Sequence, residues 1–240
     1  LEKNIKTIFL NKKNSPTIIK KRFIEQINKT KVFGIYSLND QPLDNDQENK
    51  LNKKIQKLIQ SHDLVIVSDY GHGFISDRTA KLIVKKSKFV AVNTQLNASN
   101  LGFHVISKYI GANFITINET EMRHELRNKT EARTPLIKML SKKLKSKYTH
   151  VTSGSMGSTI FNSASKEITS CPAFANKIMD KVGTGDTMLA ILAISLFKKF
   201  DIRFTMFLSA LAAAQNIQDM ANKTPINKVN ITRALQSYLK

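Results

Sequence analysis

Apolar and polar positions follow two different rhythms along this chain, and the change falls near residue 62. Before it, residues 5–9, 17–27 and 31–37 are rich in β-branched and aromatic side chains, which predicts extended strands. A polar connector over residues 41–49 leads into residues 51–60, where Leu51, Ile55 and Leu58 recur at the spacing of one helical face. The first quarter of the chain is therefore expected to hold strands followed by one helix.

From residue 62 onward, apolar runs alternate with segments of helical spacing. Residues 63–68 form an almost continuous apolar run, as expected of a strand that is buried on both faces. Further strands are predicted at 89–93, 113–118 and 148–152, helices at 77–86 and from 119, and a short antiparallel pair at 158–161 and 167–170. The last third is predicted to be helical over 185–200, 204–221 and 229–239. The expected fold class is α/β, with a mostly parallel central sheet and helices on both faces.

Composition excludes several classes of protein. A hydrophobic fraction of 41% excludes a disordered chain. The single cysteine, Cys171, excludes an intramolecular disulfide and a metal site built from several cysteines. No apolar run has the length of a membrane span, and the segment that begins at Leu1 has no signal-peptide pattern. We therefore expect a cytoplasmic protein with no membrane partner, whose chain begins inside a longer protein.

The net charge of +20 raises the question of a nucleic-acid partner. The lysines are spread along the whole chain among asparagine and isoleucine rather than gathered in a stripe. Aromatic stacking platforms and a recognition helix are not recognisable in the sequence. We expect a solvated basic surface without nucleic-acid binding, whose positive field favours an anionic substrate.

The sharpest candidate for chemistry is the run Gly183-Thr184-Gly185-Asp186 before an apolar helix. Glycines let successive backbone N–H groups converge on one anion, and a helix N-terminus adds partial positive charge. Asp186 is placed to accept a proton from a substrate hydroxyl. An N-cap aspartate in an ordinary glycine turn explains the same run equally well when it is taken alone.

Two further motifs follow predicted strands. Asn118 and Glu121 open a helix, where an amide oxygen and a carboxylate suit Mg²⁺ held partly through water. The alternative is a capped helix start with acidic first-turn residues. Thr152, Gly154 and Gly157 follow the next strand, where the glycines allow a close approach of backbone to phosphates. The alternative here is a glycine-containing hairpin turn, and both interpretations can hold together.

Two segments in the first third of the chain suggest a further ligand site. Asp69, Tyr70 and Gly71 follow the strand at 63–68, at the carboxyl end where parallel sheets bind ligands. His72, in the same glycine loop, is interpreted as a variable surface residue. Lys20 and Arg22 share one side of a predicted strand, which suits an anionic sugar, although exposed cations on an edge strand are also common.

Residues 180–187, together with the three motifs above, resemble the signatures of ribokinase-like (pfkB-type) sugar kinases. The resemblance implies that Asp186 is the catalytic base and that Gly183, Thr184 and Gly185 form an anion hole. It implies ATP and Mg²⁺ as cofactors, organised by Asn118 and Glu121, and a monovalent cation such as K⁺. The nucleotide is expected to be bordered by Thr152, Gly154, Gly157 and Asn216.

A finer resemblance connects the chain to heptose-phosphate kinases, through the segment from Asp69 to Gly73 and the Pro16-to-Arg22 strand. It implies a sugar or sugar-phosphate acceptor held by Lys20, Arg22, Asp69, Tyr70, Gly71 and Asn93. One departure is that residues 92–95 carry amides where the family has Asp-Pro-Lys. Asn93, Gln95, Asn97 and Asn100 remain candidates to line the site.

The resemblance also covers the organisation of the protein. We expect one kinase domain over 1–240, with lid strands in 1–40 and an α/β core in 41–240, and without the family's N-terminal region. A homodimer or a fused nucleotidyltransferase domain is implied by the family. The rival hypothesis is a non-catalytic or incomplete kinase-like binding domain.

Overall fold

The computed structural model describes residues 4–27, 30–97, 100–102, 106–175, 182–218 and 225–238. Asp180, Lys181 and His104 lie outside the described residues, as do the predicted ends of two helices at Ala221 and Leu239. The conclusions below concern the described part of the chain.

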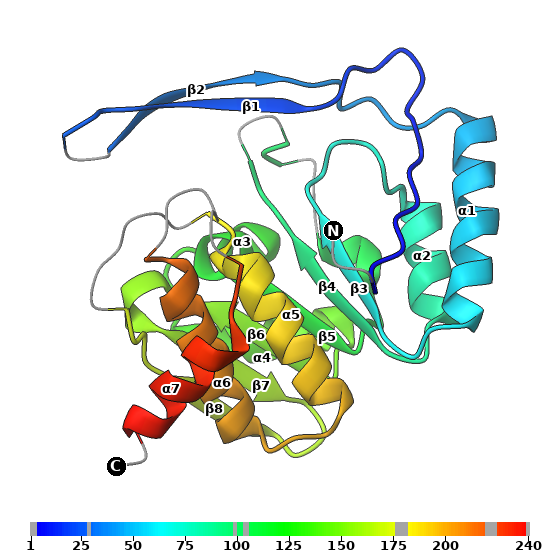
Figure 1. Ribbon diagram of the computed structural model, residues 1–240. Coiled ribbons are helices and arrows are strands. Elements are labelled where there is room, and N and C mark those ends of the chain that lie inside the picture. Colours follow the sequence, from blue (N-terminus) through cyan, green and yellow to red (C-terminus); the bar gives the residue numbers. More distant parts are fainter. Residues whose placement is uncertain are drawn as a thin grey trace.

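A six-stranded sheet forms the centre of the molecule (Figure 1). Its strands are β3 (Val65–Asp69), β4 (Val90–Thr94), β5 (Phe114–Asn118), β6 (Tyr148–Thr152), β7 (Ser158–Asn162) and β8 (Glu167–Cys171), in that spatial order. The first four strands pair in parallel, whereas β7 and β8 continue the sheet as an antiparallel edge. The mostly parallel sheet and the antiparallel pair predicted from the sequence are both confirmed.

Helices cover both faces of this sheet (Figure 1). They are α1 (Asn45–Gln60), α2 (Asp77–Lys86), α3 (Glu119–Leu126), α4 (Arg133–Leu144), α5 (Thr184–Phe197), α6 (Ile202–Asn216) and α7 (Lys228–Tyr238), with short 3₁₀ turns η1 (Ile106–Tyr109) and η2 (Gly154–Met156). One buried cluster joins β-strand side chains such as Ile115 to Ile83 and Leu140. A second joins Phe114, the next residue toward the N-terminus on β5, to Leu192 and Met206. Successive residues of a strand therefore pack into cores on opposite faces of the sheet, which explains why the strands are continuous apolar runs.

Two predicted helix boundaries need correction. Helix α1 begins at Asn45 rather than 51, because the Asp44 side chain accepts a hydrogen bond from the Gln47 N–H and so caps an otherwise polar first turn. The single helix expected from residue 119 is two helices, because Arg127 adopts a left-handed conformation (φ 50°) and ends α3. None of the described helices combines the length and the apolar character needed to cross a membrane.

A separate two-stranded hairpin extends away from the central sheet (Figure 1). Strands β1 (Ile19–Ile24) and β2 (Lys31–Ser37) pair antiparallel, and Phe23 stacks on Phe33 with ring centroids 4.3 Å apart. The prediction of a strand at 5–9 is wrong, because that segment pairs with no strand in the described part of the chain. The division of the chain at residue 40 stays a prediction.

Candidate active site

Asp186 lies in the first turn of α5, beside the carboxyl end of β3. The N-cap residue of α5 is Gly183, whose φ of 82° is left-handed. No side chain at this position caps the first turn of the helix by a hydrogen bond. This arrangement excludes the interpretation of Asp186 as an N-cap. The first N–H groups of a helix have no intrahelical partner, so this end of α5 presents backbone donors next to the Asp186 carboxylate.

Two hydroxyl groups hold the Asp186 carboxylate. Ser68 Oγ donates to Oδ1 at 2.9 Å, and the Tyr70 hydroxyl donates to Oδ2 at 3.1 Å. Burial raises the pKa of Tyr70, and the negative charge of Asp186 acts in the same direction, so Tyr70 stays a donor. Sequence reasoning selected Tyr70 but missed Ser68, whose one signal is a hydroxyl that ends the apolar run at 63–68.

Asp69 fixes the loop that follows β3 through the contacts of its carboxylate. Its buried carboxylate contacts Lys108 Nζ and the Tyr109 hydroxyl, each at 2.6 Å, and accepts from the Gly71 N–H at 2.9 Å. Burial raises the pKa of Asp69, but the Lys108 ammonium and these hydrogen bonds outweigh burial and hold it below its usual range. Lys108 and Tyr109, both on η1, had no sequence signal because their role depends on tertiary contact.

Amide side chains between residues 93 and 100 support the same loop and the neighbouring strand. Asn97 Nδ2 and Asn100 Nδ2 donate to the Tyr70 carbonyl oxygen at 3.0 and 3.3 Å. Asn93 Nδ2 donates to the Thr116 carbonyl oxygen on β5 at 2.8 Å. Their observed contacts therefore position Tyr70 and the sheet, and the substrate role assigned to Asn93 stays a prediction.

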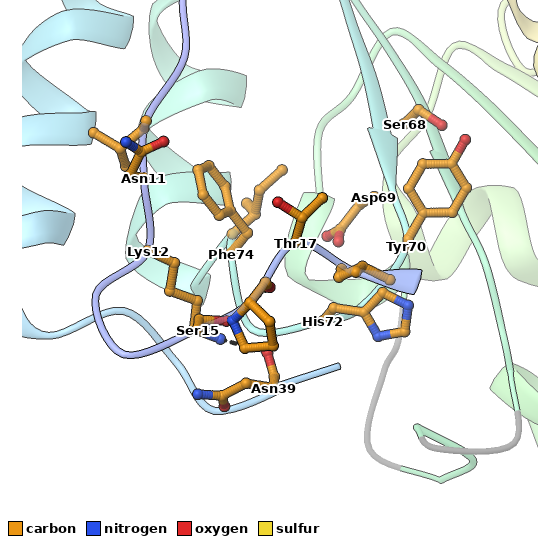
Figure 2. A pocket seen from close by; sticks show the side chains of 14 residues that line it. Asn11, Lys12, Ser15, Thr17, Asn39, Ser68, Asp69, Tyr70, His72 and Phe74 are labelled. Atoms are coloured by element: carbon orange, nitrogen blue, oxygen red, sulfur yellow. Dashed lines mark hydrogen bonds between the residues drawn. The ribbon is translucent and has the colours of Figure 1, made fainter. Parts of the chain in front are cut away.

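A cavity of about 750 Å³ opens beside this loop (Figure 2). It is lined by the segment at residues 10–18, by Asn39 and by the loop from Ser68 to Ile75. His72 lies in its wall and is 8% exposed, so its interpretation as a surface residue is wrong. Residues 39–41 and 10–18, distant in the sequence, cover the loop.

Lys20 extends from β1 toward the same loop. Its ammonium lies 5.5 Å from the centre of the Tyr70 ring and 5.9 Å from that of Tyr36. Burial lowers the pKa of Lys20, the Tyr36 interaction opposes that change, and Arg22 reinforces it from the same side of β1. The structure thus brings Lys20 next to Tyr70 and leaves Arg22 exposed.

Asn118 and Glu121 form a capping box at the start of α3. Asn118 Oδ1 accepts from the Glu121 N–H, and Glu121 Oε2 accepts from the Asn118 N–H, both at 2.8 Å. Glu121 Oε1 also accepts from the Leu96 N–H at 3.0 Å. Burial raises the pKa of Glu121. The capped-helix interpretation is therefore correct, and a metal role for the two residues stays a prediction.

The predicted nucleotide loop is a tight connection between β6 and β7. Gly154 and Gly157 both have positive φ, and a Cβ on Gly157 would lie 2.1 Å from the Cys171 carbonyl oxygen. Glu119 holds this loop, because its Oε2 accepts from Ser153 Oγ at 2.8 Å and from Arg133 Nε at 3.0 Å. Glu119 was not predicted from the sequence, since its partners come from two other elements.

Thr184 and Asn216, both predicted from the sequence, are brought together. Thr184 Oγ1 donates to Asn216 Oδ1 at 3.2 Å, which joins the start of α5 to the end of α6. The predicted residues thus gather around the carboxyl ends of β3 to β6 and the start of α5. Parallel sheets bind ligands at this edge.

The residues present fit a nucleotide and Mg²⁺. A Cβ added at Gly154 or Gly185 would meet no atom within 4 Å, so both backbones face open space. No group of three or more histidine, cysteine or acidic side chains with metal-binding geometry occurs among the described residues. The amide and carboxylate oxygens of Asn118 and Glu121 are of the hard donor type that Mg²⁺ binds, directly or through water.

The profile of pfkB family carbohydrate kinases matches residues 3–228 of the chain. Among curated proteins, the bifunctional protein HldE of Helicobacter pylori (strain Shi470) is 31% identical over 227 residues, which cover 92% of this chain and 47% of that protein. The HldE of Campylobacter jejuni (strain RM1221) is 28% identical over 225 residues, or 89% of this chain and 45% of that protein. The chain therefore spans less than half the length of these relatives.

Solved structures share the fold at low identity. Ribokinase from Thermotoga maritima has a TM-score of 0.71 at 16% identity, covering 92% of this chain and 70% of that one. Arabidopsis thaliana ribokinase, solved with ribose and ATP, has a TM-score of 0.68 at 17% identity, with coverage of 93% and 70%. Escherichia coli phosphofructokinase-2 with potassium has a TM-score of 0.68 at 12% identity, with coverage of 86% and 67%. The expected ribokinase-like fold is confirmed.

Proposed function

Because the chain belongs to the pfkB family of carbohydrate kinases, we propose that it transfers the γ-phosphoryl group of ATP to a hydroxyl of a sugar or sugar phosphate. The observation that carries the proposal is the position of Asp186. Its carboxylate is oriented by Ser68 and Tyr70 and lies beside the uncapped start of α5. A base and a group of anion-binding donors are thus adjacent, as phosphoryl transfer requires.

ATP supplies the transferred group, and Mg²⁺ neutralises part of its charge. Asp186 accepts the proton of the acceptor hydroxyl, which makes that oxygen a better nucleophile. The N–H groups of Thr184, Gly185 and Asp186 are the first three of α5. They stabilise negative charge that develops beside them, because they are fixed in position before the reaction.

The nucleotide is assigned to the edge formed by the loop from Thr152 to Gly157 and by Asn216. Gly154 allows a close approach of the backbone, and Glu119 fixes Ser153 in that loop. Asn118 and Glu121 lie at the start of α3, which is connected directly to β5. We assign them to the organisation of Mg²⁺ through water, since their own hydrogen bonds already use the carboxylate oxygens.

A heptose phosphate is the proposed acceptor. The support is the sequence resemblance at Asp69–Gly73 and at Lys20 and Arg22, together with the position of Lys20 beside Tyr70. An ammonium group there suits an anionic substituent on the sugar. A potassium ion, a homodimer and a fused nucleotidyltransferase domain belong to the same proposal. One structural neighbour was solved with potassium, and the curated relatives are bifunctional.

The test is Mg²⁺-dependent ADP formation by the full-length protein with a heptose phosphate, fructose 6-phosphate and ribose. Turnover with at least one of them, dependent on both ATP and the sugar, is expected. Calorimetry with ATP and Mg²⁺ should show nucleotide binding in the same preparation. Nucleotide binding without turnover on any sugar would favour the rival hypothesis of a non-catalytic kinase-like binding domain. Absence of both would remove the proposal.

A further inference from the structure

His72 has an unusual environment for a histidine. It is 8% exposed, and both Nδ1 and Nε2 lack a hydrogen-bond partner within the described part of the chain. Leaving a buried polar group unpaired costs about 1–3 kcal/mol. A side chain that keeps two such atoms in the wall of a cavity is therefore suited to receive a ligand.

The backbone turns His72 into this position. Gly71 and Gly73, on either side, have φ of 69° and 72°, which other residues adopt at a cost. A Cβ on Gly73 would lie 2.2 Å from the Gln41 carbonyl oxygen, so the loop is pressed against the chain that follows β2. Figure 2 shows His72 and Tyr70 in the wall of the same cavity. Tyr70, which lines the cavity, also donates to Asp186, so the wall that holds His72 includes a residue that contacts the proposed base.

Several other polar groups in this wall are already occupied. Lys12 Nζ donates to the carbonyl oxygens of Asn39 and Gln41. Asp69 is held by Lys108 and Tyr109. Ser68 and Tyr70 donate to Asp186. Among the described titratable side chains of the wall, His72 is therefore the one that makes no hydrogen bond of its own.

We propose that His72 is a specificity-determining residue that hydrogen-bonds a hydroxyl of the sugar acceptor. The inference rests on the proposed sugar kinase function and deepens it. A neutral imidazole has one donor and one acceptor, and a sugar hydroxyl both donates and accepts. A phosphate group offers acceptors alone and would leave one ring nitrogen unpaired. The cavity therefore recognises the polyhydroxy part of the acceptor at His72, and Lys20 is left for an anionic group.

The charges around His72 support the neutral form. Burial lowers the pKa of His72, and Lys20 on β1 and Lys12 in the N-terminal segment act in the same direction. Asp40, which follows β2, and Asp69 on β3 oppose this shift and are outweighed. At pH 7 the imidazole is thus ready to pair with a neutral hydroxyl.

Kinetics on the full-length protein test this role. His72→Leu removes both hydrogen-bonding atoms, and the KM for the sugar should rise about tenfold, the equivalent of about 1.4 kcal/mol of hydrogen bonding. The KM for ATP should stay unchanged. His72→Gln restores a donor and an acceptor and should recover most of the loss. His62→Gln is the control, since His62 is exposed and bonds the Leu58 carbonyl oxygen in the last turn of α1.

A spectroscopic measurement separates this inference from the proposed function. Long-range ¹H–¹⁵N spectra should show the His72 ring signals shifting when fructose 6-phosphate or a heptose phosphate is added to the ADP-bound protein. ADP alone should not move them. Turnover of a sugar with unmoved His72 signals and an unchanged sugar KM in His72→Leu overturns the inference and leaves the kinase function intact. No response and no turnover with any sugar overturns both.

Discussion

The hydroxyl of Tyr70 donates a hydrogen bond to Oδ2 of Asp186 at 3.1 Å, although 116 positions of sequence separate the two residues. The contact joins the loop after β3 to the start of α5, a helix that packs against β3 and β4. Asn97 and Asn100 hold the Tyr70 backbone from a third segment. The orientation of the proposed base is therefore set by three loops at one edge of the sheet.

Replacing Asp186 by asparagine should slow phosphoryl transfer on the order of 10²–10⁴-fold, because an amide cannot accept the hydroxyl proton. The fold should be retained, since the N-cap of α5 is Gly183. Steady-state turnover and thermal unfolding measure the two effects. Asp201→Asn is the matched control, because Asp201 caps α6 by accepting from the Phe204 N–H, and asparagine caps about equally well. Equal turnover in Asp186→Asn and wild type would falsify the role of the base.

Tyr70→Phe tests whether the carboxylate must be oriented. The substitution removes a hydrogen bond to a charged group, a contact typically worth about 1.5–3 kcal/mol, and kcat should fall about tenfold or more. Ser68→Ala should have a similar effect through the other carboxylate oxygen. Both variants should retain nucleotide affinity measured by calorimetry. A positioning role predicts that the double variant loses less than the product of the single losses, because both act on one carboxylate.

The strands of the central sheet were predicted within two residues, because a strand buried on both faces gives an apolar run with little ambiguity. The start of α1 was missed because residues 45–50 are polar and give no apolar helical spacing. The hydrogen bond by which Asp44 caps the helix is visible only in the structure. His72 was misjudged for a related reason. Its flanking glycines suggest an exposed loop, and the residues that cover it come from distant segments.

The motifs identified the parts of the site that lie in one short run, such as Gly183 to Asp186. The residues that support them were missed. Ser68, Lys108 and Glu119 each act through partners elsewhere in the chain, and no spacing along the sequence records such contacts. Asn118 and Glu121 show the opposite case, because their capping box lies within four consecutive residues and was one of the two interpretations of the sequence. Their metal role stays a prediction.

Glu119→Ala should weaken nucleotide binding. The carboxylate joins Ser153 to Arg133, so its loss frees the loop from Thr152 to Gly157 and removes the carboxylate partner of Arg123 and Arg133. The KM for ATP should rise about tenfold, the equivalent of one lost charge-assisted hydrogen bond. The KM for the sugar should not change. Glu125→Ala is the control from the same helix, because Glu125 pairs with Lys143 away from that loop; an equal rise in both variants contradicts a specific role for Glu119.

Gly157→Ala and Gly154→Ala should differ in their effect on stability. Both positions have positive φ, but a Cβ on Gly157 would lie 2.1 Å from the Cys171 carbonyl oxygen, whereas one on Gly154 meets open space. The left-handed backbone alone costs about 1–2 kcal/mol, and the clash should add about 1–3 kcal/mol at Gly157. Urea unfolding of the two variants measures the difference. Equal loss in both would mean that the β6–β7 connection relaxes around the added methyl group.

His150 should make the protein less stable as the pH falls below neutrality. It is fully buried on β6, with Nδ1 2.8 Å from Thr116 Oγ1, and burial lowers its pKa to about 3. In the unfolded chain a histidine has a pKa of about 6.5. Between those values the unfolded state binds more protons, so the free energy of unfolding decreases with falling pH, by about 2 kcal/mol from pH 7 to pH 5. His72, whose pKa burial also lowers, contributes in the same direction.

The double variant His150→Val with Thr116→Val removes the titrating group and its partner together, so neither is left buried and unpaired. The free energy of unfolding from urea titrations at pH 5, 6 and 7 should then depend less steeply on pH than in wild type. His62→Gln is the control for the loss of a histidine as such, because His62 is exposed. If the double variant keeps the wild-type slope, the acid sensitivity comes from other groups, since a valine pair cannot take up a proton in either state.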